Sequence, residues 1–257
     1  MGKMGQSRHL KRMAAPGSWR IPRKGTTWVV KPSPGPHPIE DSIPLLILVR
    51  DLLKIADNMR EAKKIIKSGH IKVDGVVRKD HKFPVGLMDV VEIPLIDKAY
   101  RVLPSKKWFT LVQIDAREAE FKLCQIRNII TVKGGNIQLA LHDGRNILLP
   151  VENPKISPHE VYPYNTRDTI KILLENQEIV DHVPFKEGAY SLIVGGKMRG
   201  GQGEIVEIRR RIGRRASTAI VKCDGNFVET LLDYVFPVGL TQPLIKLPGV
   251  EESTWSS

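Results

Sequence analysis

The sequence predicts an α+β protein of several domains rather than one small module. Its 257 residues exceed what a single small module uses. A helical pattern of apolar residues occupies one stretch near residues 45–67, whereas short apolar runs separated by Gly-containing turns recur through the rest of the chain. No apolar run approaches the ~18 to 20 residues that a membrane span needs. We therefore expect a soluble, mainly β-structured protein with one small helical part.

Basic residues are concentrated in three segments of the chain, which carries 40 Lys and Arg against 28 Asp and Glu. Residues 1–39 hold eight basic residues and no acid, residues 60–82 hold eight and three, and residues 197–215 hold seven and two. The remainder is slightly acidic. Because neutralised phosphates release counterions, this distribution predicts surfaces for a polyanion. Basic residues that merely solvate a surface would be scattered evenly.

Residues 1–41 form the first predicted part, an extended basic arm. Six prolines and several glycines interrupt every apolar period, so this segment alone cannot offset the entropy cost of ordering. The rings of Trp19 and Trp28 either stack on unpaired bases or pack against the next domain. We expect the arm to order on its target and the folded core to begin at Ile43. Its candidate phosphate ligands are Arg8, Lys11, Arg12, Arg20, Arg23 and Lys24.

Residues 42–103 predict a compact α/β module. Ser42 suits a helix N-cap and Pro44 the first turn of an apolar helix that reaches Ile55. A second helix over residues 59–67 has Asn58 as its N-cap and Gly69 as its stop. The apolar residues of this helix fall on one arc. Its four basic residues fall on a nearly opposite arc, and they are Arg60, Lys63, Lys64 and Lys67.

A tight hairpin follows the second helix, because Asp74-Gly75 between residues 70–73 and 76–79 is typical of a type I′ turn. The order of helix, glycine stop, hairpin and a later Gly-x-x-Asp resembles the small RNA-binding domain named after bacterial small-subunit ribosomal protein number four. The matching residues are Arg60, Ala62, Ile65, Gly69, His70, Ile71, Val73, Asp74, Gly75, Val85, Gly86, Asp89 and Ile93. The resemblance implies that the second helix and the hairpin clasp structured RNA. The hairpin residues expected to take part are Lys72, Arg78 and Lys79.

Residues 104–180 predict a β-rich central domain. Strands are expected over residues 129–132, 137–141, 147–149 and 169–174, and residues 108–114 form either a strand or the start of a short helix. Asp143-Gly144 again indicates a hairpin turn.

The central region shows no pattern that catalysis or metal binding requires. Asp115, Glu118 and Glu120 have no neighbouring base or metal ligand and are interpreted as a solvated face. His142 and His159 each stand alone. Cys124 and Cys223 lie far apart without CxxC spacing, which excludes a disulfide scaffold and a cysteine-rich zinc ribbon and fits a reducing compartment. We expect no catalytic residue, metal or cofactor.

Residues 181–257 predict a small β-barrel and a tail. Gly196-Lys197 lacks the earlier glycine and the following Ser or Thr of a phosphate-binding loop, and a strand rather than a helix follows Gly203. This segment resembles the KOW motif of small β-barrels in ribosomal and transcription proteins. The features that match are, in order, a strand, Gly-Gly-Lys, Arg-Gly, a further Gly and a second strand. That resemblance implies a tight turn with positive φ at Gly203. The candidate phosphate ligands here are Lys197, Arg199, Arg209, Arg210, Arg211, Arg214 and Arg215.

The order of these four parts resembles the family of small-subunit ribosomal protein number four of the archaeal and eukaryotic type. Further matching segments are residues 134–139, 142–146, 168–172 and 227–230, and the short ending after Leu247-Pro248 favours an archaeal form. The resemblance implies a structural, non-enzymatic constituent of the cytoplasmic small ribosomal subunit. Its partners would be small-subunit rRNA and neighbouring ribosomal proteins, with no membrane, small-molecule substrate or cofactor.

Two other classes of protein remain as alternatives. An RNA-modifying enzyme can carry a similar RNA-binding domain, but it needs a large catalytic domain that this length does not provide. A KOW-bearing transcription or chromatin factor would instead prefer polymerase or duplex DNA over folded RNA.

Overall fold

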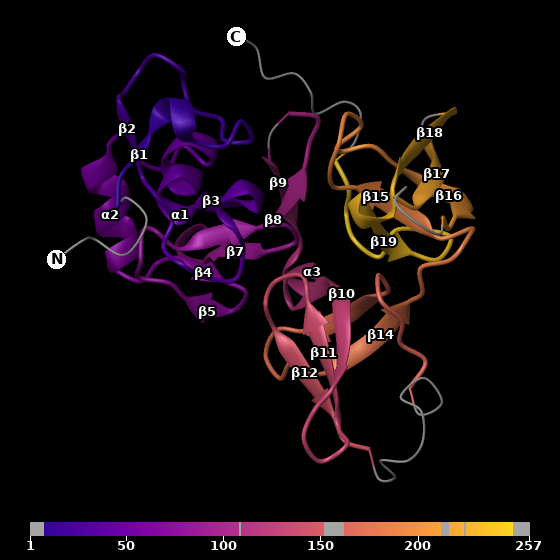
Figure 1. The fold of residues 1–257 in the computed structure, drawn as a ribbon. Coiled ribbons are helices and arrows are strands. Elements are labelled where there is room, and N and C mark those ends of the chain that lie inside the picture. The colour runs from indigo at the N-terminus through magenta and orange to yellow at the C-terminus, as the bar shows by residue number, and fades with distance from the viewer. Residues whose placement is uncertain (1–7, 108, 152–161, 212–215, 224, 249–257) are drawn as a thin grey trace, which may run out of the picture.

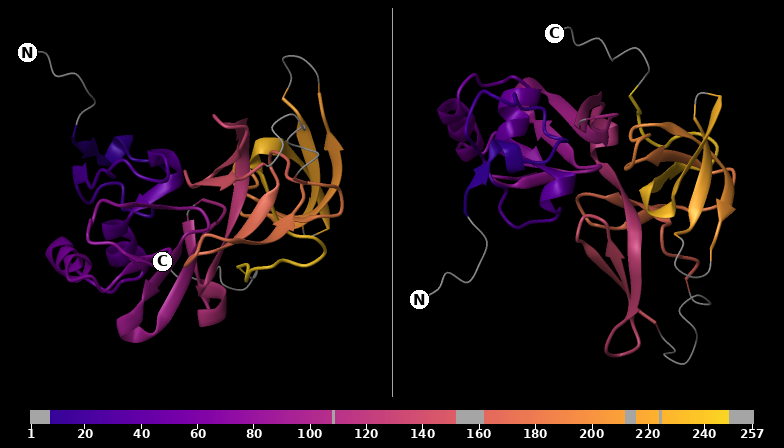
Figure 2. Two further views of the ribbon diagram at one scale, coloured as in Figure 1. Left: turned by 90° about the horizontal axis from the view of Figure 1, so that it is seen from below. Right: turned by 45° about the horizontal axis from the view of Figure 1, so that its top comes forward.

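The computed structural model describes residues 8–107, 109–151, 162–211, 216–223 and 225–248. Within these ranges lie three five-stranded antiparallel sheets and two pairs of short strands. Figure 1 shows the helical N-terminal part on one side, the central sheet below it and the C-terminal sheet opposite. Figure 2 shows the same three bodies from two further directions. The predicted mixture of one small helical part and much sheet is confirmed.

The N-terminal segment folds onto the module that follows it. Strand β1 (Leu10–Lys11) pairs with β2 (Trp28–Val29), with the 3₁₀ turn η1 (Arg12–Ala14) after β1 and η2 (Ile39–Asp41) at the end. Trp19 is fully buried in the core of the next module, and its Nε1 donates a 2.6 Å hydrogen bond to the carbonyl of Ser42. The expectation that this arm is separate from the core is therefore wrong for residues 8–41.

The first predicted helix is shorter and less regular than expected. It consists of α1 (Leu45–Ile47) followed by the π-helical segment η3 (Leu48–Leu52). Ser42 is not its N-cap, because residues 42–44 form strand β3 (Ser42–Pro44), which pairs with β6 (Pro84–Gly86). The apolar sequence here places every residue from 42 to 49 in the core.

The second predicted helix, α2 (Met59–Lys67), is confirmed together with its ends. The Glu61 carboxylate accepts hydrogen bonds from the backbone N–H groups of Asp57 and Asn58, which lowers the pKa of Glu61. The chain leaves the helix at Gly69, whose φ of +81° suits glycine.

The sheet of this module has the strand order β5-β4-β7-β8-β9. Its strands are β4 (Lys72–Val73), β5 (Val76–Val77), β7 (Val90–Ile93), β8 (Lys98–Pro104) and β9 (Phe109–Ile114), with the 3₁₀ turn η4 (Pro94–Ile96) before β8. The predicted hairpin turn is confirmed, because Asp74 and Gly75 have φ values of +51° and +75°. The expected boundary between residues 103 and 104 is corrected, since it cuts the β8–β9 pairing.

The central sheet follows the short helix α3 (Ala116–Ala119) and has the order β12-β11-β10-β13-β14. The strands are β10 (Phe121–Thr131), β11 (Ile137–Leu141), β12 (Asn146–Leu149), β13 (Thr169–Leu173) and β14 (Ile179–Val183). The strands predicted over residues 137–141, 147–149 and 169–174 are confirmed to within one residue, whereas the strand predicted over residues 129–132 is only the end of the longer β10. The first half of the long β10 pairs with β13 and its second half pairs with β11. Gly144, at φ +77°, turns the chain between β11 and β12.

The C-terminal sheet has the order β18-β17-β16-β15-β19. Its strands are β15 (Tyr190–Ile193), β16 (Gln202–Arg209), β17 (Thr218–Cys223), β18 (Asn226–Leu231) and β19 (Val235–Gly239), with η5 (Leu232–Tyr234) before the last. Gly203 does not occupy a positive-φ turn; it lies inside β16, opposite Cys223. A Cβ there would come within 1.9 Å of the Lys222 carbonyl oxygen, so close backbone approach is what requires glycine.

One apolar cluster joins the three sheets. It contains Met88 and Leu103 from the first module, Leu123 from β10, and Leu192 and Phe236 from the C-terminal sheet, all buried. Within the part of the chain that the structure describes, no helix is long and apolar enough to span a membrane.

Candidate nucleic-acid interface

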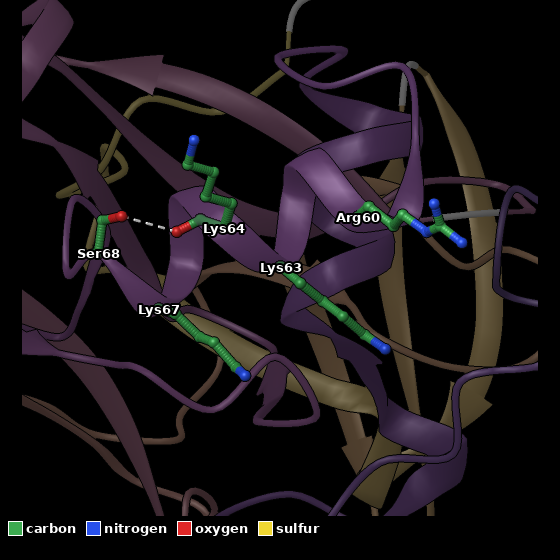
Figure 3. Close-up of a pocket in the computed structure, with 5 residues that line it drawn as sticks. All are labelled: Arg60, Lys63, Lys64, Lys67 and Ser68. Atoms are coloured by element: carbon green, nitrogen blue, oxygen red, sulfur yellow. Dashed lines mark hydrogen bonds between the residues drawn. The ribbon is translucent and has the colours of Figure 1, made fainter.

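The outer face of α2 is a continuous cationic surface. Arg60, Lys63, Lys64 and Lys67 line a shallow groove of about 400 Å³ together with Ser68, as Figure 3 shows. Ala62 and Ile66 are buried on the opposite side of the helix. Among the described residues, none of the four cations forms an ion pair with a carboxylate. Their charge is therefore left available to an anionic partner.

The potential of this face acts on a neighbouring histidine. Burial and the nearby charge of Lys63 lower the pKa of His81 and so disfavour its charged form. Of the four α2 cations, Lys63 and Lys67 therefore lie close enough to His81 for their charges to act on it.

The three hairpin residues predicted to share this surface separate into different environments. Lys79 is exposed, and its side chain passes beside Gly69 at the end of α2. Arg78 is half-buried, with its guanidinium 4.4 Å from the centre of the Phe83 ring. Lys72 lies opposite Glu92 in the sheet and lines a different groove, in which acidic residues outnumber basic ones. Of these three hairpin residues, only Lys79 extends the α2 face and has no ion pair or ring contact among the described residues.

The basic residues of the N-terminal segment also differ in their accessibility. Arg12 is turned inward and donates hydrogen bonds to the carbonyls of Ile21 and Pro22, where it closes the segment on itself. The Lys11 ammonium lies 5.8 Å from the ring of Trp28, which is 57% exposed. The remaining four predicted residues are exposed: Arg8, Arg20, Arg23 and Lys24.

The C-terminal basic run is partly neutralised by acids of its own sheet. Arg209 pairs with Glu207 at 2.8 Å and Arg211 with Glu229 at 3.3 Å, both on exposed side chains. Arg210 and Lys197 are exposed. Arg214 and Arg215 lie outside the described residues.

Arg199 is placed differently from what the sequence predicts. Its guanidinium packs 4.5 Å from the centre of the Phe109 ring, and its Nε is buried with no hydrogen-bond partner in the described structure. Burial lowers the pKa of Arg199. This residue belongs to the junction between the C-terminal sheet and the first module.

The structure also brings together a buried charged cluster that the sequence did not predict. The Nζ of Lys122, on β10, lies 2.8 Å from Asp74 and 3.0 Å from Asp143, and it also contacts Asp89. Arg145 pairs with Asp74 at 2.7 Å and with Asp143 at 3.2 Å. His37 of the N-terminal segment binds Asp89 at 3.0 Å. The charged cluster therefore ties the N-terminal segment, the first module and the central sheet together.

Burial and pairing set the protonation states of the charged cluster. Burial disfavours the charged form of Lys122, but the facing carboxylates outweigh it and raise the pKa of Lys122 well above the ordinary value. For two acids the effect of burial is outweighed by Lys122 together with other positive neighbours, Arg145 near Asp143 and His37 near Asp89, which lowers the pKa of Asp143 to about 2 and that of Asp89 further. For Asp74 burial is the largest influence, and it raises the pKa of this carboxyl group. The charged cluster is thus an arrangement of opposed charges around one ammonium.

Cys124, His142 and Asp143 lie close enough together to suggest a metal site, but their donor atoms are already engaged. His142 accepts the Gln125 backbone N–H on Nδ1 and contacts the Leu87 carbonyl through Nε2. Asp143 is held by Lys122. Burial raises the pKa of the Cys124 thiol well above its ordinary value, which disfavours the thiolate that a metal needs.

A sequence signal for the charged cluster exists only in retrospect. Asp74 and Asp143 stand in the two Asp-Gly pairs that predict hairpin turns, and Lys122 stands in an otherwise buried run of β10. A lysine in such a run requires a partner, but the sequence does not say which carboxylates meet it.

Three family models and a solved structure match this chain. The Ribosomal family S4e profile matches residues 96–179, the RS4NT (NUC023) domain matches residues 4–40, and the S4 domain matches residues 45–91. The crystal structure of the 30S ribosomal protein S4e from Thermoplasma acidophilum superposes with a TM-score of 0.62 at 29% identity, covering 77% of this chain and 95% of that one.

Curated relatives match over nearly the whole chain. The small ribosomal subunit protein eS4 of Ignicoccus hospitalis is 51% identical over 253 residues, 98% of each chain. The protein of the same name from Desulfurococcus amylolyticus is 49% identical over 257 residues, covering 99% of this chain and 100% of the relative. With about half of its residues identical to these relatives across their full length, and with all three domain profiles present in order, this chain belongs to the ribosomal S4e family.

Proposed function

We propose that this chain is a structural constituent of the small ribosomal subunit and binds small-subunit rRNA, with the α2 face as its principal contact. The observation that carries the proposal is the set of four cations on α2 that have no carboxylate partner among the described residues. Cations without partners on a rigid helix suit the backbone of folded RNA, which is recognised by shape and phosphate position. The S4 domain, matched over residues 45–91, contains this helix.

Two further surfaces supplement the α2 face in this proposal. The exposed basic residues of the N-terminal segment lie on the same module as α2, so one stretch of RNA could meet both. In this proposal the C-terminal sheet is the KOW-like part of the chain, and its exposed Lys197 and Arg210 reach a second RNA segment. The chain thus holds two RNA segments at a distance set by the apolar cluster and the charged cluster between its parts.

The proposed role is architectural rather than catalytic. The ribosomal S4e family is not a class of enzymes, and the buried groups of the charged cluster are paired with one another. Its place is the ribosome, with rRNA and neighbouring ribosomal proteins as partners. The relatives' names favour neither an RNA-modifying enzyme nor a transcription factor.

The test replaces the four α2 cations by glutamine. Because these side chains lie opposite the buried arc, the variant should keep its melting temperature within a few degrees. Each lost phosphate contact should reduce the slope of log affinity against log salt by about 0.7 to 0.9 on small-subunit rRNA. A matched control removes four exposed lysines elsewhere, Lys98, Lys133, Lys186 and Lys246, and should retain most of the slope. If both variants lose the same slope, net charge rather than the α2 face determines binding.

A further inference from the structure

A pocket of about 240 Å³ lies where the three parts of the molecule meet. Its walls come from the N-terminal segment (Asp41), from β9 (Phe109), from the loop before β16 (Arg199) and from η5 (Tyr234). The volume is below the ~300 Å³ of the smallest ordinary ligand pockets, so it suits one ring system rather than a chain of nucleotides. The predicted phosphate contacts on α2 do not line it.

One wall of the pocket is an aromatic ring held flat against glycine backbone. A Cβ at Gly195 would come within 2.5 Å of the Tyr234 ring, and a Cβ at Gly196 within 3.4 Å. The Val194 N–H also donates a 2.8 Å hydrogen bond to the Tyr234 carbonyl. The Gly-Gly pair that precedes Lys197 thus has a structural reason: it lets one side of the Tyr234 ring lie on the backbone. The ring remains 37% exposed and lines the pocket.

Among the polar side chains that line the pocket, His37, His142 and Asp233 already have partners, whereas Arg127, Arg199 and Asp41 form no ion pair among the described residues. Arg199 and Asp41 are a donor and an acceptor that do not meet. The Arg199 guanidinium is fixed over the Phe109 ring, and its buried Nε has no acceptor among the described residues. The charge of Asp41 acts on Arg199, yet the two side chains form no ion pair. Asp41 has no other ion pair or side-chain hydrogen bond in the described structure. A ligand edge that both donates and accepts hydrogen bonds would satisfy both side chains.

We propose that this pocket binds a single unpaired guanine base of RNA, stacked on Tyr234 with its polar edge toward Asp41 and Arg199. Guanine offers two adjacent N–H donors, which suit a carboxylate, and the O6 and N7 acceptors, which suit a guanidinium. Unstacked bases of RNA are commonly held in this way, between an aromatic ring and groups that read their edges. The inference rests on the proposed function and adds one base-specific contact to binding otherwise directed at phosphates.

The experiment measures binding of fluorescein-labelled RNA hexamers to the full chain by anisotropy. Three hexamers are compared: all uridine, one central guanosine, and one central adenosine. The guanosine hexamer should bind at least about fivefold more tightly than the uridine hexamer, since base–aromatic stacking and edge contacts add to phosphate binding. Tyr234→Ala should abolish that difference without weakening binding of the uridine hexamer. Tyr234→Phe should retain it, because the ring is kept.

Two further variants control for folding and for nonspecific aromatic contacts. The guanosine hexamer should also bind more tightly than the adenosine hexamer, because adenine lacks the two adjacent N–H donors that suit Asp41. Asp41→Asn changes an exposed side chain and should reduce this second preference. Phe227→Ala removes another exposed aromatic ring, on β18 and outside the pocket, and should change neither preference. Equal binding of the three hexamers, or a guanosine preference that survives Tyr234→Ala, would overturn the pocket proposal. Salt-dependent binding of all three would in that case leave the proposed function standing, whereas absence of any RNA binding would overturn both.

Discussion

Lys122 is a fully buried charged side chain. Its ammonium is buried among three carboxylates that come from two hairpin turns and from the turn before β7. Two of these carboxylates, Asp74 and Asp143, also belong to the Asp-Gly pairs of tight turns. Each of these aspartates therefore shapes a turn and neutralises a buried cation.

The first prediction concerns this ammonium. Lys122→Met keeps the volume of the side chain but leaves the carboxylates facing one another in a buried site. Breaking a buried charge cluster in this way should cost about 3–5 kcal/mol in the free energy of unfolding. Urea unfolding at pH 7 measures the loss.

The matched control for Lys122→Met is Lys171→Met on the neighbouring strand β13. The Lys171 ammonium lies 4.0 Å from the centre of the Phe121 ring and has no ion pair with a carboxylate among the described residues. Its replacement should cost about 1 kcal/mol or less. Similar losses in the two variants would show that the charged cluster has no special role in stability.

At the scale of single elements, α2 and β16 show two different relations between sequence and structure. The ends of α2 and its two faces follow from residues within the helix and its caps. In β16, by contrast, the need for glycine at position 203 arises from a carbonyl of the next strand. A local pattern identified the glycine as important but assigned it the wrong backbone conformation.

The second prediction follows from that close approach. Gly203→Ala places a Cβ against the Lys222 carbonyl, so the two strands must separate, and overpacking of this kind costs about 1–3 kcal/mol. Gly17→Ala is the control, because a Cβ at Gly17 meets no atom within 4 Å. Thermal melts of both variants should show destabilisation at residue 203 alone. An unchanged melt for Gly203→Ala would mean that the β16–β17 pairing tolerates the extra carbon.

At the scale of the whole molecule, the parts are joined through buried side chains rather than through linkers. The apolar cluster around Leu123 and Phe236 takes residues from all three sheets. The N-terminal segment adds Trp19 to the core of the first module and His37 to the charged cluster. The distances between the proposed RNA-binding surfaces are therefore set by the fold.

The third prediction tests the N-terminal segment as part of this fold. Trp19→Ala empties a fully buried site and should cost about 3–5 kcal/mol, whereas Trp28→Ala, at a ring that is 57% exposed, should change stability by about 0.5 kcal/mol or less. Deletion of residues 1–38 should lower the melting temperature more than either substitution. Circular dichroism melts provide the comparison. A deletion variant that melts like the full chain would restore the view of this segment as a separate arm.

Features that depend on neighbouring residues could be predicted without a structure. The capped amphipathic helix α2, the Asp-Gly hairpins and the strands of the central sheet follow from periodicity and turn chemistry, because each is specified within about ten residues. The cationic face of α2 is predictable for the same reason, since the spacing of its basic residues along one helix is enough to place them together.

Only the tertiary structure decided where side chains meet across distant segments. It buried Trp19 and left Trp28 exposed, although both stand in the same Pro- and Gly-rich segment. It turned Arg12 and Arg199 inward, while Arg60 and Lys64 remained free on α2. It also placed Asp74, Asp89 and Asp143 around Lys122. The physical reason is that burial and ion pairing depend on which strands pack together, and composition and periodicity do not contain that information.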